Sequence, residues 1–401
     1  MSINKKIVWN LFGSAINNGF PILIIPILIW KLGESLYGEM VVSLSLWGFI
    51  AVLVSYGFQV TGSKLIAENI KNEINNDQTI VTIIATKLIL FLFGLFILII
   101  YTAFKKNEIS LLILTAPYAI GSAMNLNWLY IGEGNFREQA KIITTQKIIS
   151  FIMIILFTLF DNLNALIVVH SAGIFILSCL QWYQCRIIKK INFSIEIRCV
   201  IFQLKESFPI FSVAGLSGFF QNIIPVVVYE INGSIYVTYY NVCMTLNRFG
   251  QQVVQAIFQV TFQHTNSKEI LNKNDELVKI VRLLVYALII IIMTIYMLSA
   301  NIMQLSKTFE LLVIPAIITI IYLILYILVN LFGVQSLVPL GKSSYLQRSS
   351  IIGVLLAGGM MENLIYEYSV AGAIMTLVTC EFLILLQLVH YHVKKNIRLV
   401  L

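Results

Sequence analysis

The residues of this sequence best suited to bind a polar ligand are charged side chains inside long apolar stretches. Arg248 lies at the centre of the stretch 235–262, and Lys87 and Glu381 lie inside two other stretches of this kind. A charge in such a position is costly in lipid, so it usually faces the interior of a helix bundle or a water-filled cavity. We therefore take these three residues as candidates for function.

Arg248 belongs to a row of polar residues whose spacing alternates between three and four positions. The row consists of Asn241, Thr245, Arg248, Gln252, Gln255 and Gln259. On a helix these residues share one face. In a hydrated lumen the amides could hydrogen-bond sugar hydroxyls, and the guanidinium could bind phosphate oxygens in a bidentate manner. The alternative is bonding between packed helices, which rarely needs six successive positions on one face, so we favour the lumen.

The other two charges have several possible roles. The long side chain of Lys87 could carry its ammonium to the lipid headgroups, or it could bind a ligand. Glu381 could pair with Arg248, titrate during a transport cycle, or stay protonated as a hydrogen-bond donor. The sequence does not rank these roles.

Two further groups of residues could contact a sugar-bearing ligand. Asn17 and the adjacent Asn18 lie in the first apolar stretch, where they could bind a ligand. Alternatively, they could belong to a proline-kinked helix in which their amide groups are hydrogen-bonded within the protein. Trp128 and Tyr130 could stack on sugar rings, or they could belong to an interfacial aromatic belt.

Several kinds of catalytic site are excluded by spacing. The segment 341–343, Gly-Lys-Ser, resembles the end of a nucleotide-binding loop, but the glycine required five positions upstream is Ser336. His390 and His392 are two positions apart and so lie on different helix faces. We therefore expect no ATP hydrolysis, no metal centre, no cofactor and no enzymatic activity.

The composition indicates an environment of lipid. Charged residues make up 11% of the 401 residues, against roughly 25% in soluble domains, and hydrophobic residues make up 59%. The net charge of +8 comes from cations scattered between apolar stretches rather than gathered in one basic domain. We therefore expect contact with membrane lipids and no nucleic-acid partner.

Twelve apolar stretches are long enough to cross a bilayer as helices. They are residues 9–32, 37–61, 79–104, 109–131, 142–160, 163–185, 208–231, 235–262, 278–299, 309–332, 345–365 and 369–390. With the N-terminus inside, 21 of the 27 Lys and Arg residues fall in or beside cytoplasmic segments and 4 fall in outer loops. Because cations are retained on the cytoplasmic side, both termini are predicted to be cytoplasmic.

The chain divides into two halves of six spans each. A polar segment, 186–207, separates an N-terminal lobe (1–185) from a C-terminal lobe (208–401), and both lobes are predicted to have the same orientation. A shift of 200 residues places Gly33 on Gly233 and the sequence Phe-Gln-Val-Thr of 58–61 on 258–261. The predicted fold is therefore an all-α polytopic membrane protein with two parallel six-helix lobes around a central cavity.

Short motifs in order along this topology resemble a known family. In the first half they are Leu32-Gly33 with Tyr37-Gly38, Tyr56-Gly57-Phe58 with Ile66-Ala67, and Trp128-Leu129-Tyr130 with Gly132. In the second half they are residues 205–209 (KESFP), 233–240, 333–335 with 339–341, and Gly372-Ala373 before Glu381. The sequence resembles the O-antigen (Wzx-type) polysaccharide flippases of the multidrug/oligosaccharidyl-lipid/polysaccharide (MOP) exporter superfamily. Two positions depart from that family, Ser55 and the segment 304–307 (QLSK), and they leave the coupling ion open.

The resemblance implies a flippase of the bacterial inner (cytoplasmic) membrane. Its cargo would be an undecaprenyl-pyrophosphate-linked oligosaccharide, moved from the inner to the outer leaflet by alternating access, and its partners would include polysaccharide polymerase machinery. On this hypothesis Arg248 neutralises the pyrophosphate, and the amide row together with Asn17 and Asn18 solvates the glycan. The rivals are a drug or metabolite exporter of the same superfamily and an O-antigen polymerase or ligase. The last needs a sizeable outer loop, whereas every predicted outer loop is shorter than about ten residues.

Overall fold

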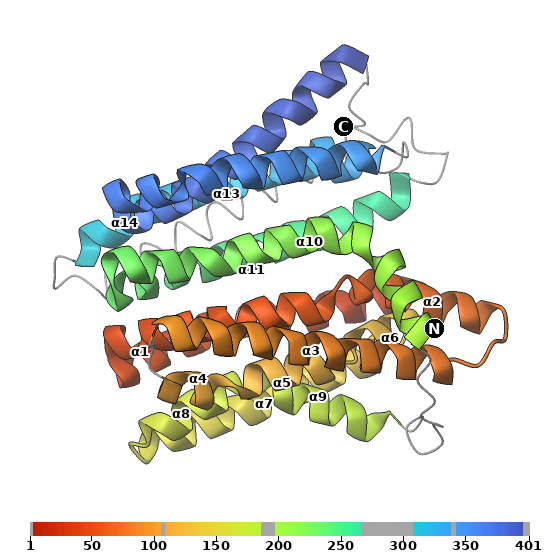
Figure 1. Cartoon of the computed structure of the whole chain (residues 1–401), viewed down its shortest axis with the longest axis horizontal. Helices are drawn as coiled ribbons and strands as arrows, with labels where there is room; N and C mark the ends of the chain where they lie inside the picture. Colours follow the sequence, from red (N-terminus) through yellow and green to blue (C-terminus); the bar gives the residue numbers. More distant parts are fainter. Residues whose placement is uncertain (1–2, 106–108, 186–196, 266–307, 338–341, 396–401) are drawn as a thin grey trace. The chain divides into compact units, whose positions relative to one another are not determined.

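The computed structural model describes residues 3–105, 109–185, 197–265, 308–337 and 342–395. Within these ranges every regular element is a helix (Figure 1). The N-terminal elements are α1 (Ile3–Ser55), α2 (Phe58–Lys71), α3 (Asp77–Lys105), α4 (Ile109–Thr115), α5 (Pro117–Met124), α6 (Asn127–Gly132), α7 (Phe136–Leu159), α8 (Leu163–Ser171) and α9 (Gly173–Gln184). The remaining elements are α10 (Ile197–Asn232), α11 (Ser234–Thr265), α13 (Thr308–Asn330), the π-helical turn η2 (Leu331–Gln335) and α14 (Ser343–Lys395).

The chain forms two compact units, residues 1–226 and 227–401, which we call the N-terminal and C-terminal units. In the N-terminal unit α1 packs against α3, α5 and α7, and α5 packs against α9. In the C-terminal unit α13 packs against both α11 and α14 (Figure 1). These two helical bundles agree with the predicted all-α fold of two lobes.

The helices are long and apolar enough to cross a membrane several times. In the described residues six helices meet this criterion by length and composition, or eight if two bent helix pairs each count as one span. Two of the six, Phe12–Lys71 and Ser344–Lys395, contain 60 and 52 residues, and each covers two predicted spans. The predicted span 278–299 lies outside the described residues, so the count of twelve stays a prediction.

Two glycines make corresponding breaks in the two halves of the chain. Gly33 interrupts α1 with a φ of 78°, and Gly233 separates α10 from α11 with a φ of 96°. A Cβ atom on either glycine would meet no atom within 4 Å, so the left-handed backbone, rather than a lack of space, requires glycine here. A glycine with positive φ thus recurs 200 residues apart, at the positions that the shifted sequence aligns.

The helices bury polar residues and expose apolar ones. On α3, Leu92 and Phe96 are more than 60% exposed, whereas Thr82 and Thr86 are buried. Both threonine hydroxyls donate to carbonyls one turn earlier, at 2.7 Å, which satisfies them without water. An apolar exterior with satisfied polar groups inside is the pattern expected of helices in lipid.

The fourth predicted span, 109–131, is not one continuous helix. It is divided into α4, α5 and α6, and the last break falls at Asn125, whose φ of −65° and ψ of 130° are those of extended backbone. Backbone that leaves the helix at membrane depth must have its polar groups satisfied inside the protein or in a water-filled cavity. This break is where the pocket of the N-terminal unit forms.

Candidate functional site

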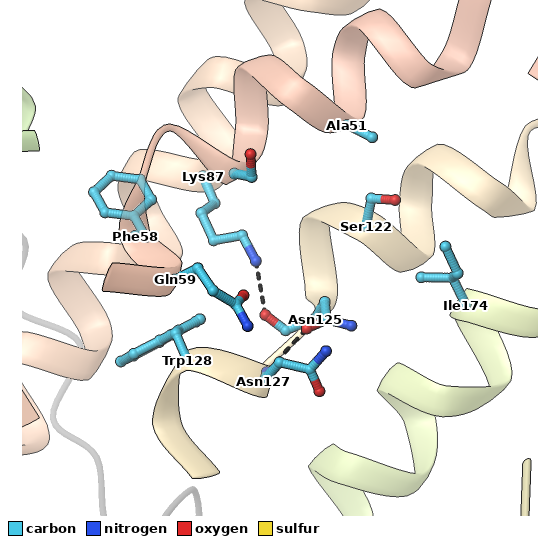
Figure 2. Close-up of a pocket in the computed structure, with 10 residues that line it drawn as sticks. Ala51, Phe58, Gln59, Lys87, Ser122, Asn125, Asn127, Trp128 and Ile174 are labelled. Atoms are coloured by element: carbon cyan, nitrogen blue, oxygen red, sulfur yellow. Dashed lines mark hydrogen bonds between the residues drawn. The ribbon is translucent and has the colours of Figure 1, made fainter. Parts of the chain in front are cut away.

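A pocket of about 200 Å³, lined by both polar and apolar residues, lies inside the N-terminal unit. Its lining residues come from α1, α2, α3, α5, α6 and α9 and from the break between α5 and α6 (Figure 2). The pocket is lined by Ala51, Ser55, Phe58, Gln59, Lys87, Ser122, Asn125, Asn127, Trp128 and Ile174. Pockets for drug-sized ligands usually measure about 300–1,000 Å³. This pocket therefore has room for one part of a large ligand.

Gln181 of α9 holds the break between α5 and α6 in place. Its Oε1 accepts a hydrogen bond from the backbone N–H of Leu126 at 2.9 Å, and its Nε2 donates to Asn127 Oδ1 at 2.6 Å. The backbone N–H of Asn127 in turn donates to Asn125 Oδ1 at 2.9 Å. Gln181 and Asn125 thus each satisfy a backbone N–H that no helix satisfies, and Asn127 holds the amide of Gln181 in place, which fixes the wall of the pocket.

Lys87 uses the backbone that the break sets free. Its Nζ donates to the carbonyl oxygen of Asn125 at 2.7 Å, and the residue is only 4% exposed (Figure 2). The ammonium is therefore held inside the bundle by a carbonyl near the C-terminal end of α5, where a cation is favoured. It does not extend along α3 toward the headgroups.

The apolar wall of the pocket comes from two aromatic residues. Phe58 and Trp128 are each 2% exposed and belong to one core cluster with Leu129. The indole N–H of Trp128 is buried and has no hydrogen-bond partner. Trp128 therefore lines the pocket, as its candidacy for ligand contact requires, and it carries an unused donor.

The remaining candidates of the N-terminal unit lie elsewhere. Tyr130 is 5% exposed and does not line the pocket, and its hydroxyl donates to the carbonyl of Gln181 at 3.2 Å. Asn17 is exposed on α1, and Asn18 donates through its side chain to the carbonyl of Ser14 at 2.8 Å.

Arg248 lies on the surface of the C-terminal unit. It is exposed on α11, while Asn241 and Gln252 are half-buried and Thr245 is buried. Thr245 donates to the carbonyl of Asn241 at 2.8 Å. The predicted row therefore runs along one side of α11 with the guanidinium at its most accessible point.

Part of the predicted row joins helices. Gln255 Nε2 donates to the hydroxyl of Tyr326 on α13 at 2.6 Å, and one turn earlier Gln251 is hydrogen-bonded to Tyr322. These two glutamine–tyrosine pairs link α11 to α13, which is the interhelical role that the sequence left open for the amides. The side chain of Gln259 lies outside what the structure describes.

Glu381 lies on α14 beside these pairs. Its electrostatic neighbours include Tyr322 and Tyr326, and one of its carboxyl oxygens, Oε2, is buried without a hydrogen-bond partner. Among the described residues no ion pair joins Glu381 to Arg248. The carboxyl group therefore sits among phenol groups inside the C-terminal unit.

Sequence reasoning found Lys87 and Trp128 but missed the other polar residues of this site. Gln59, Asn125 and Asn127 line the pocket, and Gln181 supports it from behind. The sequence did contain one indication of the break. Asn125 and Asn127 lie two positions apart inside a predicted span, and asparagine side chains can bond to nearby backbone and so favour a break in a helix.

Comparisons with known proteins agree with this architecture. Residues 3–262 match the sequence model of a family described as "Polysaccharide biosynthesis protein". None of the curated proteins matches the chain significantly.

Solved structures share the fold at low sequence identity. A MOP superfamily transporter from Pyrococcus furiosus, described by the reverse polarity of its binding pocket, is 15% identical with a TM-score of 0.64, over 98% of this chain and 95% of that one. A multidrug resistance MATE family transporter is 15% identical in its inward-facing conformation, with a TM-score of 0.58 over 100% and 95% of the two chains. The outward-facing conformation of a multidrug resistance MATE family transporter is 13% identical, with a TM-score of 0.61, over 97% of this chain and 94% of that one. The chain thus has the fold of MOP superfamily transporters.

Proposed function

Because the chain belongs to the polysaccharide biosynthesis protein family, we propose that it is a flippase for undecaprenyl-pyrophosphate-linked oligosaccharides. It moves this cargo from the cytoplasmic to the outer leaflet of the bacterial inner membrane by alternating access, with both termini in the cytoplasm. The observation that carries the proposal is the pocket at a broken helix inside an apolar bundle, with Lys87, Asn125 and Asn127 in its lining. Secondary transporters bind their substrates at discontinuous helices of this kind.

Each part of the cargo has a suitable group on the protein. The exposed guanidinium of Arg248 can neutralise the pyrophosphate through bidentate bonds. Half-buried Asn241 and Gln252, with Asn17 and Asn18, supply amides for sugar hydroxyls. The pocket at Lys87 takes one unit of the glycan, in keeping with its small volume.

The membrane potential supplies a driving force that needs no nucleotide. One charge that moves through 100 mV gains about 2.3 kcal/mol, so a pyrophosphate with two negative charges gains about 4.6 kcal/mol when it leaves a negative interior. Glu381, buried in part among tyrosines, is the group through which a coupled ion would act.

Deletion of the gene in its own host tests the function. We expect lipid-linked oligosaccharide to accumulate in the inner leaflet and surface polysaccharide to be lost, and the wild-type gene to restore both. Normal surface polysaccharide with a new sensitivity to small amphipathic drugs would instead identify a drug exporter, the rival within the same superfamily.

A substitution of Arg248 tests its role separately. We expect Arg248→Ala to lower surface polysaccharide at normal protein abundance, because the pyrophosphate loses its cation. Arg348→Ala is the matched control, since Arg348 is an exposed arginine of α14 outside the row. Wild-type levels of surface polysaccharide in Arg248→Ala would show that Arg248 does not have this role.

A further inference from the structure

No residue that the structure describes gives Lys87 a counter-ion. Among the described residues no ion pair includes Lys87, although the residue is almost fully buried. Its one hydrogen bond, to the carbonyl of Asn125, leaves two of its three N–H donors unused. Because pairing and hydrogen bonding stabilise a buried charge, an anionic group within reach of this ammonium would be favoured.

The backbone fixes which way the pocket amides point. The N–H of Leu126 can only donate, so it identifies the Gln181 atom that it contacts as the oxygen. The other end of Gln181 must then be its NH₂ group, which identifies the Asn127 atom 2.6 Å away as Oδ1. The backbone N–H of Asn127 fixes Asn125 Oδ1 by the same reasoning.

Consequently the wall of the pocket formed by Lys87, Asn125 and Asn127 presents a cluster of donors. The side-chain oxygens of Asn125 and Asn127 are both engaged, so their NH₂ groups remain for a ligand. The same wall carries the two spare N–H groups of Lys87. A sugar hydroxyl donates and accepts, whereas an ionised carboxylate group or a phosphodiester group only accepts.

We propose that this pocket binds an anionic group, a carboxylate or a phosphate, through Lys87, Asn125 and Asn127. Given the proposed function, on which the identity of the cargo rests, the natural source is a sugar acid or a sugar phosphate within the lipid-linked glycan. The volume of about 200 Å³ suits one charged sugar unit. The bound anion acts as the counter-ion that no described residue provides for Lys87.

Binding of small probes to the full-length protein in zwitterionic nanodiscs tests the proposal. The probes are glucuronate, inorganic phosphate and glucose, followed by calorimetry and by the shift in unfolding temperature. We expect at least one of the two anions to bind at least about ten-fold more tightly than glucose. Equal binding of glucose, or no binding of either anion, would overturn the proposal.

The relative strength of the two anions identifies the source. Tighter glucuronate binding indicates a sugar acid, and tighter phosphate binding indicates a phosphate. Nanodiscs that contain an anionic phospholipid then separate a lipid headgroup, which would compete with free phosphate, from a phosphate on the glycan, which would leave phosphate binding unchanged.

An isosteric substitution tests the pocket without disturbing its frame. Asn127→Asp keeps an oxygen for Gln181 but replaces the free NH₂ with a carboxylate oxygen that pairs with Lys87. We expect anion affinity to fall at least about ten-fold while the unfolding temperature stays the same or rises. Unchanged affinity in this variant would place the binding elsewhere.

Lys147→Met is the matched control. Lys147 is a cation of α7 that packs over the ring of Phe20, 5.0 Å from its centroid, and does not line the pocket. Anion affinity should remain that of the wild type, and a loss equal to that of Asn127→Asp would show a nonspecific effect of charge and overturn the assignment. If neither anion binds while gene deletion still traps glycan in the inner leaflet, the pocket proposal is wrong and the flippase proposal stands. If gene deletion leaves surface polysaccharide intact while the anions bind normally, the flippase proposal is wrong and the pocket proposal stands.

Discussion

Lys87 and Arg248 are both cations inside apolar stretches, yet the two units accommodate them differently. Lys87 is buried against a carbonyl that a broken helix sets free, whereas Arg248 is exposed on a helix without a break. In the N-terminal unit the broken helix forms a wall of the pocket. In the C-terminal unit α11 is unbroken and is joined to α13 through glutamine–tyrosine pairs.

The difference shows that depth in a span does not determine the environment of a charge. Both cations are near the middle of helices, and the neighbouring backbone decides which one is enclosed. Where a break in a helix leaves carbonyl and amide groups free, they can bind a cation that is buried away from both lipid and water. Where the helix is intact, the charge stays at an accessible surface.

Loss of Gln181 should have the largest effect on the N-terminal unit. Gln181→Leu leaves the buried N–H of Leu126 without its partner and removes one hydrogen bond from Asn127, which is half-buried at the pocket. At about 1–3 kcal/mol for the buried orphaned group and about 0.5–1.5 kcal/mol for the other hydrogen bond, we expect a destabilisation of about 1.5–4.5 kcal/mol, measured by reversible unfolding in detergent. A change below about 1 kcal/mol would mean that the break does not depend on this clamp.

Lys87→Met separates function from stability. We expect surface polysaccharide to fall at least about ten-fold while the free energy of unfolding changes by only about 1 kcal/mol, because relief of an unpaired charge offsets the loss of one hydrogen bond. Removal of one partner from a structural buried ion pair costs about 3–5 kcal/mol, and a loss of that size would indicate a purely structural lysine.

Arg248→Ala should reduce export with a stability change within about 0.5 kcal/mol, as expected for an exposed residue.

The two corresponding glycines should respond alike. Gly33→Ala and Gly233→Ala each force a Cβ into left-handed backbone, at a cost of about 1–2 kcal/mol. Gly359→Ala is the control, because Gly359 lies inside α14 with open space around it and should gain about 0.5–1 kcal/mol. Thermal unfolding of the three variants measures the comparison, and a large difference between Gly33→Ala and Gly233→Ala would contradict the repeat.

Gln255→Leu should have the smallest effect. It removes one hydrogen bond between α11 and α13, and such bonds in membrane proteins average about 0.6 kcal/mol. In the same unfolding assay, we expect the loss of stability in Gln255→Leu to be several-fold smaller than that in Gln181→Leu. An effect as large as that of Gln181→Leu would remove the contrast between the units.

The sequence predicts the architecture well because the membrane imposes a simple pattern. Long apolar stretches, scattered cations and the recurrence of Gly33 at Gly233 are enough for an all-helical fold of two lobes. Lys87 and Trp128 were also within reach as candidates, since charge and aromatic type are visible in the sequence.

The pocket itself could not be predicted in the same way. Its wall depends on a break at Asn125 and on Gln181, a residue 56 positions later in the chain, and no local pattern pairs them. Similarly, the spacing that places Gln255 in the polar row does not reveal that Tyr326 takes its amide. Long-range hydrogen bonds decide which polar residues face a ligand and which join helices.

The most direct test of the account is flipping by the purified protein. Proteoliposomes containing the lipid-linked oligosaccharide of the host are given a potential that is negative on the donor side, and glycan that reaches the other leaflet is measured with a membrane-impermeant lectin. The account predicts rapid, potential-dependent appearance of glycan with the wild type and slow appearance with Lys87→Met and Arg248→Ala. Appearance no faster with the wild type than in protein-free liposomes would contradict it.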